Sequence, residues 1–284
     1  MVQLATIIIS ALFAGFVATM VTVLIERWGG LIGGVLGTAP STIIPAAIGM
    51  YTVGTMDEFH QSLSIIPFGM LLNIFFLGVW LVAPHWFSQS SHPLVWTMLI
   101  ALLVWCVLGI VLLFMLESFS QSISSTMIAL LGGLAVIVAA IGFNLKPHSS
   151  PKGSKAVSQQ VLVARGSIAA VAIGIAVWLK SLGWPLVAGL ASVFPAIFLT
   201  SMVALWLAQG IAVPRGAAGP MMIGGVSVAF YANIAMWAFP VYGPWYGTLI
   251  AWFGSVLIWS LPAFFIVRRR QQRWLSVQHS SPTL

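Results

Sequence analysis

The chain has 284 residues, of which 60% are hydrophobic and only 5% are charged, and its mean hydropathy is +1.07. A soluble domain of this length needs a far larger polar surface, so the composition excludes a soluble globular protein. The formal net charge is +7, and the single cysteine, Cys106, excludes a disulfide framework and a cysteine-based metal site.

Uninterrupted apolar runs predict nine transmembrane helices, because about 20 apolar residues cross a hydrocarbon core of roughly 30 Å. The first run has no basic segment before it, so we expect a retained span and not a cleaved signal peptide. Arg165 interrupts the sixth run near one end, where we expect its side chain to reach the membrane interface. The predicted spans are 4–24, 29–53, 63–83, 94–116, 123–143, 161–179, 184–208, 217–240 and 246–267.

The distribution of charge predicts the orientation of these spans. With nine spans, the lysines and arginines gather on one side of the membrane and only Lys180 lies opposite, together with Asp57, Glu58 and Glu117. The positive-inside rule makes the basic side cytoplasmic. We therefore predict a multi-pass protein of the cell inner (cytoplasmic) membrane, with its N-terminus outside and its C-terminus cytoplasmic. The basic tail, "RRRQQR", favours contact with anionic headgroups over nucleic acid.

Two spans contain helix-breaking residues at corresponding positions. The second span, which includes "GGLIGGVLGTAPSTIIPAAIGM", contains Pro40, and the seventh contains Pro195. Aligning these prolines also aligns Gly34 with Gly189. Spans 1–4 therefore resemble spans 6–9, and the fifth span links them and inverts the second copy.

The sequence thus predicts an all-α polytopic membrane protein with a 4+1+4 inverted repeat. The predicted parts are a first four-helix repeat (1–117), a linker helix with a cytoplasmic loop (118–160), a second four-helix repeat (161–267) and a basic cytoplasmic tail (268–284).

The second half carries a resemblance to a known family. Its segments "LKSLGWPLVAGLASVFPAIFLTSMVALWLAQG" and "VAFYANIAMW" resemble the GlpM family of small bacterial four-span inner-membrane proteins. In that family an "AGL…FP" stretch opens the second span, and a span rich in Trp and Tyr follows. The matching residues are Ala188, Gly189, Leu190, Phe194, Pro195, Tyr231 and Trp237. The resemblance implies a fused, inverted pair of such units, and it implies a fold unit more than an activity.

The broken spans also predict the position of a site. A proline frees a backbone carbonyl, and lipid tolerates such groups only where protein or a water-filled cavity satisfies them. Breaker-rich spans in equivalent positions of inverted halves point to the central site of a transporter, although helix packing alone is the alternative explanation. Both prolines are expected near mid-membrane and close together. The predicted substrate-binding residues are Pro40, Ser41, Thr42, Asn73, Pro195, Thr200, Ser201 and Asn233.

The predicted function is a secondary transporter or permease for an unknown small solute, with its site between spans 2 and 7. The alternative is a non-transporting accessory protein that packs on another membrane complex. The scarcity of mid-membrane carboxylates argues against a carboxylate-based proton antiporter. We expect no enzymatic activity and no cofactor, and we expect Asp57, Glu58 and His60 to lie in a solvated loop, not in a metal site. The sequence leaves open whether the protein forms a homodimer or binds a partner membrane protein.

Overall fold

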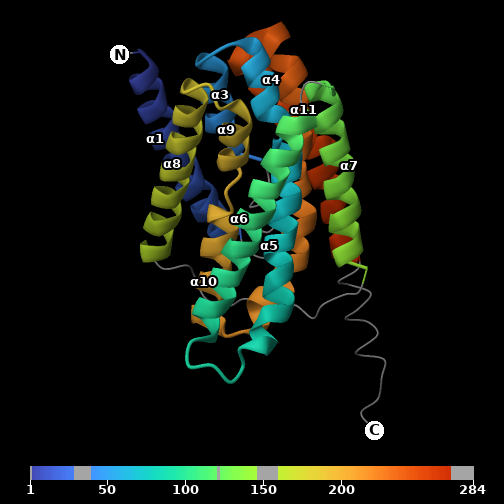
Figure 1. The fold of residues 1–284 in the computed structure, drawn as a ribbon. Helices are drawn as coiled ribbons and strands as arrows, with labels where there is room; N and C mark the ends of the chain where they lie inside the picture. The colour runs from blue at the N-terminus through green and yellow to red at the C-terminus, as the bar shows by residue number, and fades with distance from the viewer. Residues whose placement is uncertain (1, 29–39, 120–121, 146–158, 270–284) are drawn as a thin grey trace.

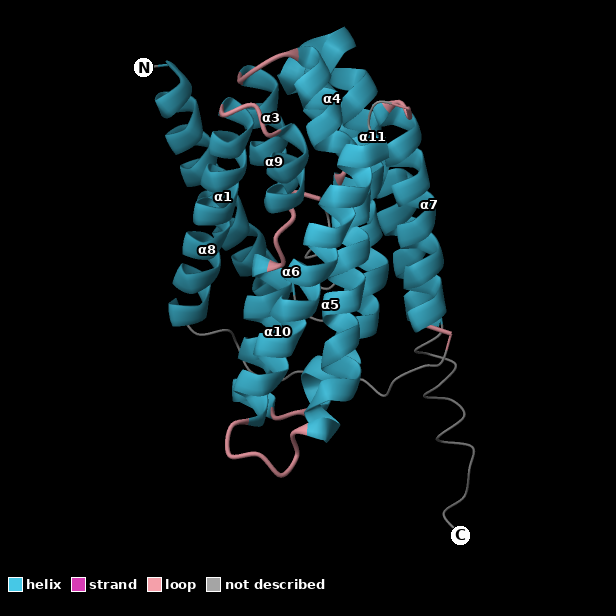
Figure 2. Ribbon diagram, viewed as in Figure 1, coloured by secondary structure: helices cyan, strands magenta, loops and turns pink. Residues whose placement is uncertain are grey.

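The protein is a bundle of helices that stand side by side (Figure 1). The computed structural model describes residues 2–28, 40–119, 122–145 and 159–269, and within these ranges all regular structure is helical (Figure 2). Seven helices of the described ranges are long and apolar enough to cross a membrane. The fold class is therefore all-α, as the sequence predicts, and it is that of a polytopic membrane protein.

The described residues contain ten α-helices. Their bounds are α1 Val2–Trp28, α3 Ile43–Thr52, α4 Met56–Ser64, α5 Ile66–Trp86, α6 Pro93–Phe119, α7 Ser125–Phe143, α8 Gln159–Ser181, α9 Pro185–Ser192, α10 Ala196–Gln209 and α11 Ala212–Ser255, which a π-helical turn, Val256–Ser260, continues towards residue 269.

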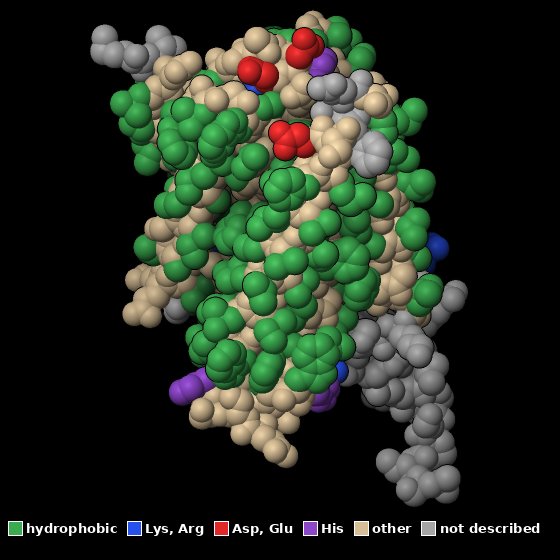
Figure 3. All heavy atoms as spheres, viewed as in Figure 1, with side chains coloured by type: hydrophobic (Ala, Val, Ile, Leu, Met, Phe, Trp, Pro, Cys, Tyr) green, Lys and Arg blue, Asp and Glu red, His purple; other side chains and the backbone are tan. Residues whose placement is uncertain are grey.

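The sides of the bundle are apolar. Hydrophobic side chains cover most of the face that Figure 3 shows, whereas acidic side chains gather at the end that carries α4. Soluble monomers rarely expose contiguous apolar surface of this extent, so a bilayer is the natural surrounding for these helices. Exposed examples on three outer helices are Leu4, Ile8, Leu12 and Phe16 of α1, Leu103, Ile110 and Phe114 of α6, and Leu130, Leu134 and Val138 of α7.

Helix α11 folds back on itself at Gly243, where φ is 74°. The indole Nε1 of Trp259 donates a hydrogen bond to the carbonyl of Ile223 at 2.7 Å. In a straight helix these residues would lie about 54 Å apart, at a rise of about 1.5 Å per residue. The two arms, 212–242 and 244–269, are therefore antiparallel, and they coincide with the predicted spans 217–240 and 246–267.

Only the second half of the predicted span 29–53 lies within the described residues, as the short helix α3. Its glycine-rich first half, with Gly30, Gly33, Gly34 and Gly37, lies outside them. The count of nine spans therefore stays a prediction.

The expectation of a solvated loop around Asp57, Glu58 and His60 is wrong, because these residues belong to α4. Thr55 precedes the helix, and its side chain accepts a hydrogen bond from the backbone N–H of Glu58 while the Glu58 carboxylate accepts one from the backbone N–H of Thr55. This capping box satisfies free donors of the first turn and starts the helix here. The chain thus becomes helical seven residues before the predicted span begins at Leu63.

Helices α1 and α8 pack closely along a seam of small residues. A Cβ atom built on Gly15 would lie 3.2 Å from Cβ of Ala170. Residue numbers rise along one helix as they fall along the other, so the two helices are antiparallel. Three contacting pairs along the seam show this: Ala11 with Gly174, Gly15 with Ala170, and Thr19 with Gly166.

A close approach of backbones also fixes α9 against α4, and it yields a first prediction. A Cβ atom on Gly189 would overlap the carbonyl of Ser62 and lie 2.6 Å from Cγ2 of Ile65. Gly189→Ala should therefore destabilise the protein by about 1–3 kcal/mol, because the backbone must move to relieve the overlap. Thermal unfolding of the detergent-solubilised protein measures this. Gly142→Ala is the matched control, since nothing lies within 4 Å of its added Cβ; equal midpoints for both variants would contradict the packing.

Candidate functional site

The predicted seventh span is broken in its middle. Helix α9 ends at Ser192 and α10 begins at Ala196, so residues 193–195 separate two half-helices. Pro195 has no backbone N–H to continue the helix and is itself buried. The break leaves the carbonyl of Val193 in need of a donor from elsewhere in the protein.

Asn73 of α5 supplies that donor. Its Nδ2 donates a hydrogen bond to the Val193 carbonyl at 3.0 Å, and its Oδ1 accepts one from Nε1 of Trp105 at 2.9 Å. The ring of Trp105 packs edge-on against Phe194, with centroids 5.4 Å apart. Asn73 is buried, and both ends of its amide are engaged within the protein. These contacts give Asn73 a positioning role at the break.

Arg165 lies beside the second half-helix. Its Nε donates to the hydroxyl of Thr200 at 3.2 Å, and its Nη2 donates to the hydroxyl of Ser201 at 2.7 Å. Its side chain is only 6% exposed, so the expectation that it reaches the membrane interface is wrong. The physical reason is that α10 brings two hydroxyls to the flank of α8, and a guanidinium prefers such acceptors to an apolar surrounding.

Thr200 and Ser201, both predicted site residues, are thus both bound by Arg165, which was not among the predicted site residues. Thr200 also donates back to the carbonyl of Ala196 at 2.8 Å, as threonines in helices commonly do. The sequence does carry a signal that could have identified Arg165: it is an ionisable residue within a predicted membrane span, and such residues are functional candidates by default.

The first half of the chain shows a related arrangement at Pro40. Pro40 is buried, Ser41 and Thr42 are half-buried, and α3 begins directly after them at Ile43. The N–H of Ile44 donates to the carbonyl of Ser41 at 3.3 Å, which starts this helix. Pro40 therefore precedes the first residue of α3 by three positions, and Pro195 precedes that of α10 by one. The predicted approach of Pro40 to Pro195 stays a prediction.

Asn233 has different surroundings from Asn73. Its Nδ2 donates to the carbonyl of Ala229 in its own helix at 2.9 Å and makes a longer contact, 3.4 Å, with the carbonyl of Ala129 in α7. These contacts connect α11 to the predicted linker helix and not to the break at Pro195.

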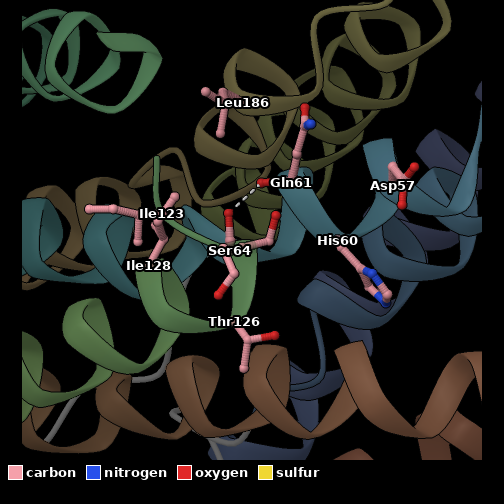
Figure 4. Close-up of a pocket in the computed structure, with 10 residues that line it drawn as sticks. Asp57, His60, Gln61, Ser64, Ile123, Thr126, Ile128 and Leu186 are labelled. Atoms are coloured by element: carbon pink, nitrogen blue, oxygen red, sulfur yellow. Dashed lines mark hydrogen bonds between the residues drawn. The ribbon is translucent and has the colours of Figure 1, made fainter. Parts of the chain in front are cut away.

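A polar cavity of about 380 Å³ opens at the α4 end of the bundle (Figure 4). Half-buried His60 stands at its wall, and its Nε2–H donates to the carbonyl of Met236 at 3.0 Å. Pro240 deprives this carbonyl of its usual helical donor four residues later, so His60 replaces that donor. The cavity is lined by Asp57, His60, Gln61, Ser64, Ile123, Ser124, Ser125, Thr126, Ile128 and Leu186.

A second, apolar groove of about 490 Å³ runs between α6 and α8. Trp105 and Phe194 are among its lining residues, so the groove reaches the break in the seventh span. The predicted site residues are absent from the linings of both hollows described here.

The chain has no match among known family models, curated proteins or solved structures. The GlpM resemblance therefore stays a prediction, and the class of protein rests on the fold: a helical membrane protein with a broken span and a buried arginine beside the break.

The contacts of Asn73 lead to a second prediction. Asn73→Ala leaves the Val193 carbonyl and the Trp105 indole N–H without these partners in apolar surroundings, at a cost of about 1–3 kcal/mol for each group. Thermal unfolding should show the loss. Asn233→Ala is the matched control and should cost no more than about 1 kcal/mol, since the Ala229 carbonyl keeps its place in the helix. Equal losses in the two variants would argue against the role of Asn73 at the break.

Proposed function

We propose that the protein is an integral membrane transporter or permease for a small solute, with its site at the break at Pro195 and at the corresponding segment around Pro40. One observation carries the proposal: the buried guanidinium of Arg165 bonds to Thr200 and Ser201, between one and two turns beyond the break at Pro195. Ionisable groups inside a membrane are costly, and they mark solute and ion pathways.

The proposed architecture is the 4+1+4 inverted repeat, in which residue n of the first half corresponds to residue n + 155 of the second. Two hydrogen bonds between the halves support this correspondence. His60 donates to the carbonyl of Met236 at 3.0 Å, and Nε of Arg215 donates to the carbonyl of Leu81 at 3.2 Å. Arg215 corresponds to His60, and Met236 corresponds to Leu81. The correspondence therefore exchanges the two hydrogen bonds, as a two-fold relation requires.

Packing contacts support the same correspondence. Gly15 touches its own equivalent, Ala170, and a Cβ atom on Gly225 would lie 3.0 Å from Cε of its equivalent, Met70. Residues that contact their own equivalents lie on a two-fold axis. The seam pairs on either side of Gly15 also exchange under this relation, because Ala11 corresponds to Gly166 and Thr19 to Gly174. The antiparallel course of α1 and α8 agrees with an axis in the membrane plane.

Such an architecture has consequences for function. In transporters built from inverted repeats, solutes bind near the midplane at half-helices, and the two halves move against each other to open either side. Helix α10 begins just after the break and α3 begins three residues after Pro40, so each offers the positive end of its dipole there. The proposal includes nine spans in the inner membrane, with the acidic α4 end outside and the basic tail against anionic headgroups.

A cross-linking experiment tests the proposed axis. In a Cys106→Ser background, the pair Gly15→Cys and Ala170→Cys should form an intramolecular disulfide on mild oxidation, because the two Cβ positions lie 3.2 Å apart. Mass spectrometry of the digested protein detects the bridge. The control pair, Ala11→Cys with Ala170→Cys, is displaced by one turn and should form far less. Equal yields from both pairs would remove the support for this register.

A transport experiment tests the function itself. Proteoliposomes with the purified protein should take up at least one component of a defined mixture of small metabolites, measured by mass spectrometry. Pro40→Ala and Pro195→Ala should each lower uptake about tenfold or more. Each substitution removes the proline that precedes a helix, and a small displacement of that helix would move the residues that bind the solute. Pro93→Ala, at the start of α6, is the control and should transport normally. Normal transport by both site variants would end the site proposal, and no uptake by the wild type would favour the accessory role.

A further inference from the structure

In the proposed repeat, the contact between α8 and α10 in the second half corresponds to the contact between α1 and α3 in the first, but the side chains at the two contacts differ chemically. The positions that correspond to Arg165, Thr200 and Ser201 are Ser10, Pro45 and Ala46, all of which are buried. Ser10 of α1 packs against α3, since a Cβ atom on Gly49 would lie 3.1 Å from its Cβ. The first half thus joins these two helices with small and apolar residues, where the second half uses a guanidinium and two hydroxyls.

This comparison separates the needs of the fold from those of function. Packing of α1 on α3 requires no charge, so the equivalent packing of α8 on α10 does not require one either. A buried guanidinium is costly in a membrane, and the alternative with small residues is present in the same chain. The cation therefore serves something other than the contact between the two helices.

The chemistry of the three side chains indicates the kind of solute. A guanidinium presents planar N–H donors that match the oxygens of carboxylate and phosphate groups. The hydroxyls of Thr200 and Ser201 lie within hydrogen-bond distance of that guanidinium and can turn towards the same ligand. Arg165 is five residues from Ala170, which places it about 7.5 Å along the helix from the proposed axis.

We propose that Arg165, Thr200 and Ser201 bind the charged group of a small oxyanion, a carboxylate or a phosphate. The proposal deepens the proposed function, since it names the class of the transported solute, and its binding part can be tested without transport.

Binding is measured by isothermal titration calorimetry on the full chain in nanodiscs of phosphatidylcholine, which carries no net charge. The probes are inorganic phosphate, acetate and succinate, with glycerol and choline as neutral and cationic comparisons. At least one anion should bind, and Arg165→Gln should weaken it about tenfold or more, the loss expected for a charge-assisted hydrogen bond. Arg165→Lys should restore part of the affinity. Thr200→Val and Ser201→Ala should weaken binding less.

Controls separate binding from stability and from lipid. Arg269→Gln removes the same charge at the exposed end of the last helix and should bind as the wild type does. Thermal unfolding of every variant identifies any that fail to fold, and Ser201→Ala keeps the test open if Arg165→Gln is one of them. Nanodiscs with phosphatidylglycerol identify a lipid headgroup as the source of the oxyanion, because that lipid would then compete with the probes in an Arg165-dependent way.

The outcomes are distinct. No binding of any anion to the wild type, or equal binding by Arg165→Gln, overturns the inference. Arg165-dependent binding without flux in proteoliposomes upholds it and removes the transport proposal. Uptake of a neutral or cationic solute that Arg165→Gln leaves unchanged overturns the inference and leaves the transport proposal standing.

Discussion

The hydrogen bond from Asn73 to the carbonyl of Val193 makes the interrupted span tenable in a membrane. Lipid offers no donor to a carbonyl that a helix has released, so the protein must supply one at the break. Asn73 is itself held by Trp105, and Trp105 packs on Phe194 at the same break. The position of α10, and with it the two hydroxyls that meet Arg165, follows from this small buried network.

The same rule explains one of the two hydrogen bonds that join the halves at their ends. Pro240 releases the carbonyl of Met236, and His60 from the other half satisfies it; at the opposite end Arg215 reaches the carbonyl of Leu81, three residues before Pro84. Between these ends the halves meet through glycines that allow close approach, as on the α1–α8 seam. Side chains with polar tips therefore hold the ends of the bundle, whereas Asn73 at the break and the small residues of the seam join the halves between these ends.

Hydropathy predicted most of the helices, because a span of fixed length must be apolar whatever it packs against. The position of proline, rather than hydropathy, located the break at Pro195, since proline acts on its own backbone. The direction of the Arg165 side chain could not be predicted in this way, because its partners, Thr200 and Ser201, are 35 and 36 residues away in the sequence. Asn73 and Asn233 were both predicted to bind substrate, and the sequence did not distinguish them for a similar reason, although one meets a broken helix and the other an intact one. Local signals fix the elements, whereas the chemistry of the site depends on contacts between them.

The chemical asymmetry bears on how the proposed transporter would work. With identical halves, a solute on the axis would meet the same surroundings whichever side were open. Arg165, displaced from the proposed axis towards the end of α8 that begins at Gln159, would make one side of the proposed site more cationic than the other. An anion would then bind with different affinity in the two conformations, and a ligand shifts a conformational equilibrium only by such a difference. That difference sets which conformation the loaded carrier prefers. It cannot drive accumulation by itself, because a cycle that returns to its starting state gains no free energy from binding. Uphill transport would need a coupled ion, whereas downhill exchange of anions needs nothing beyond the three side chains and the two hinged halves.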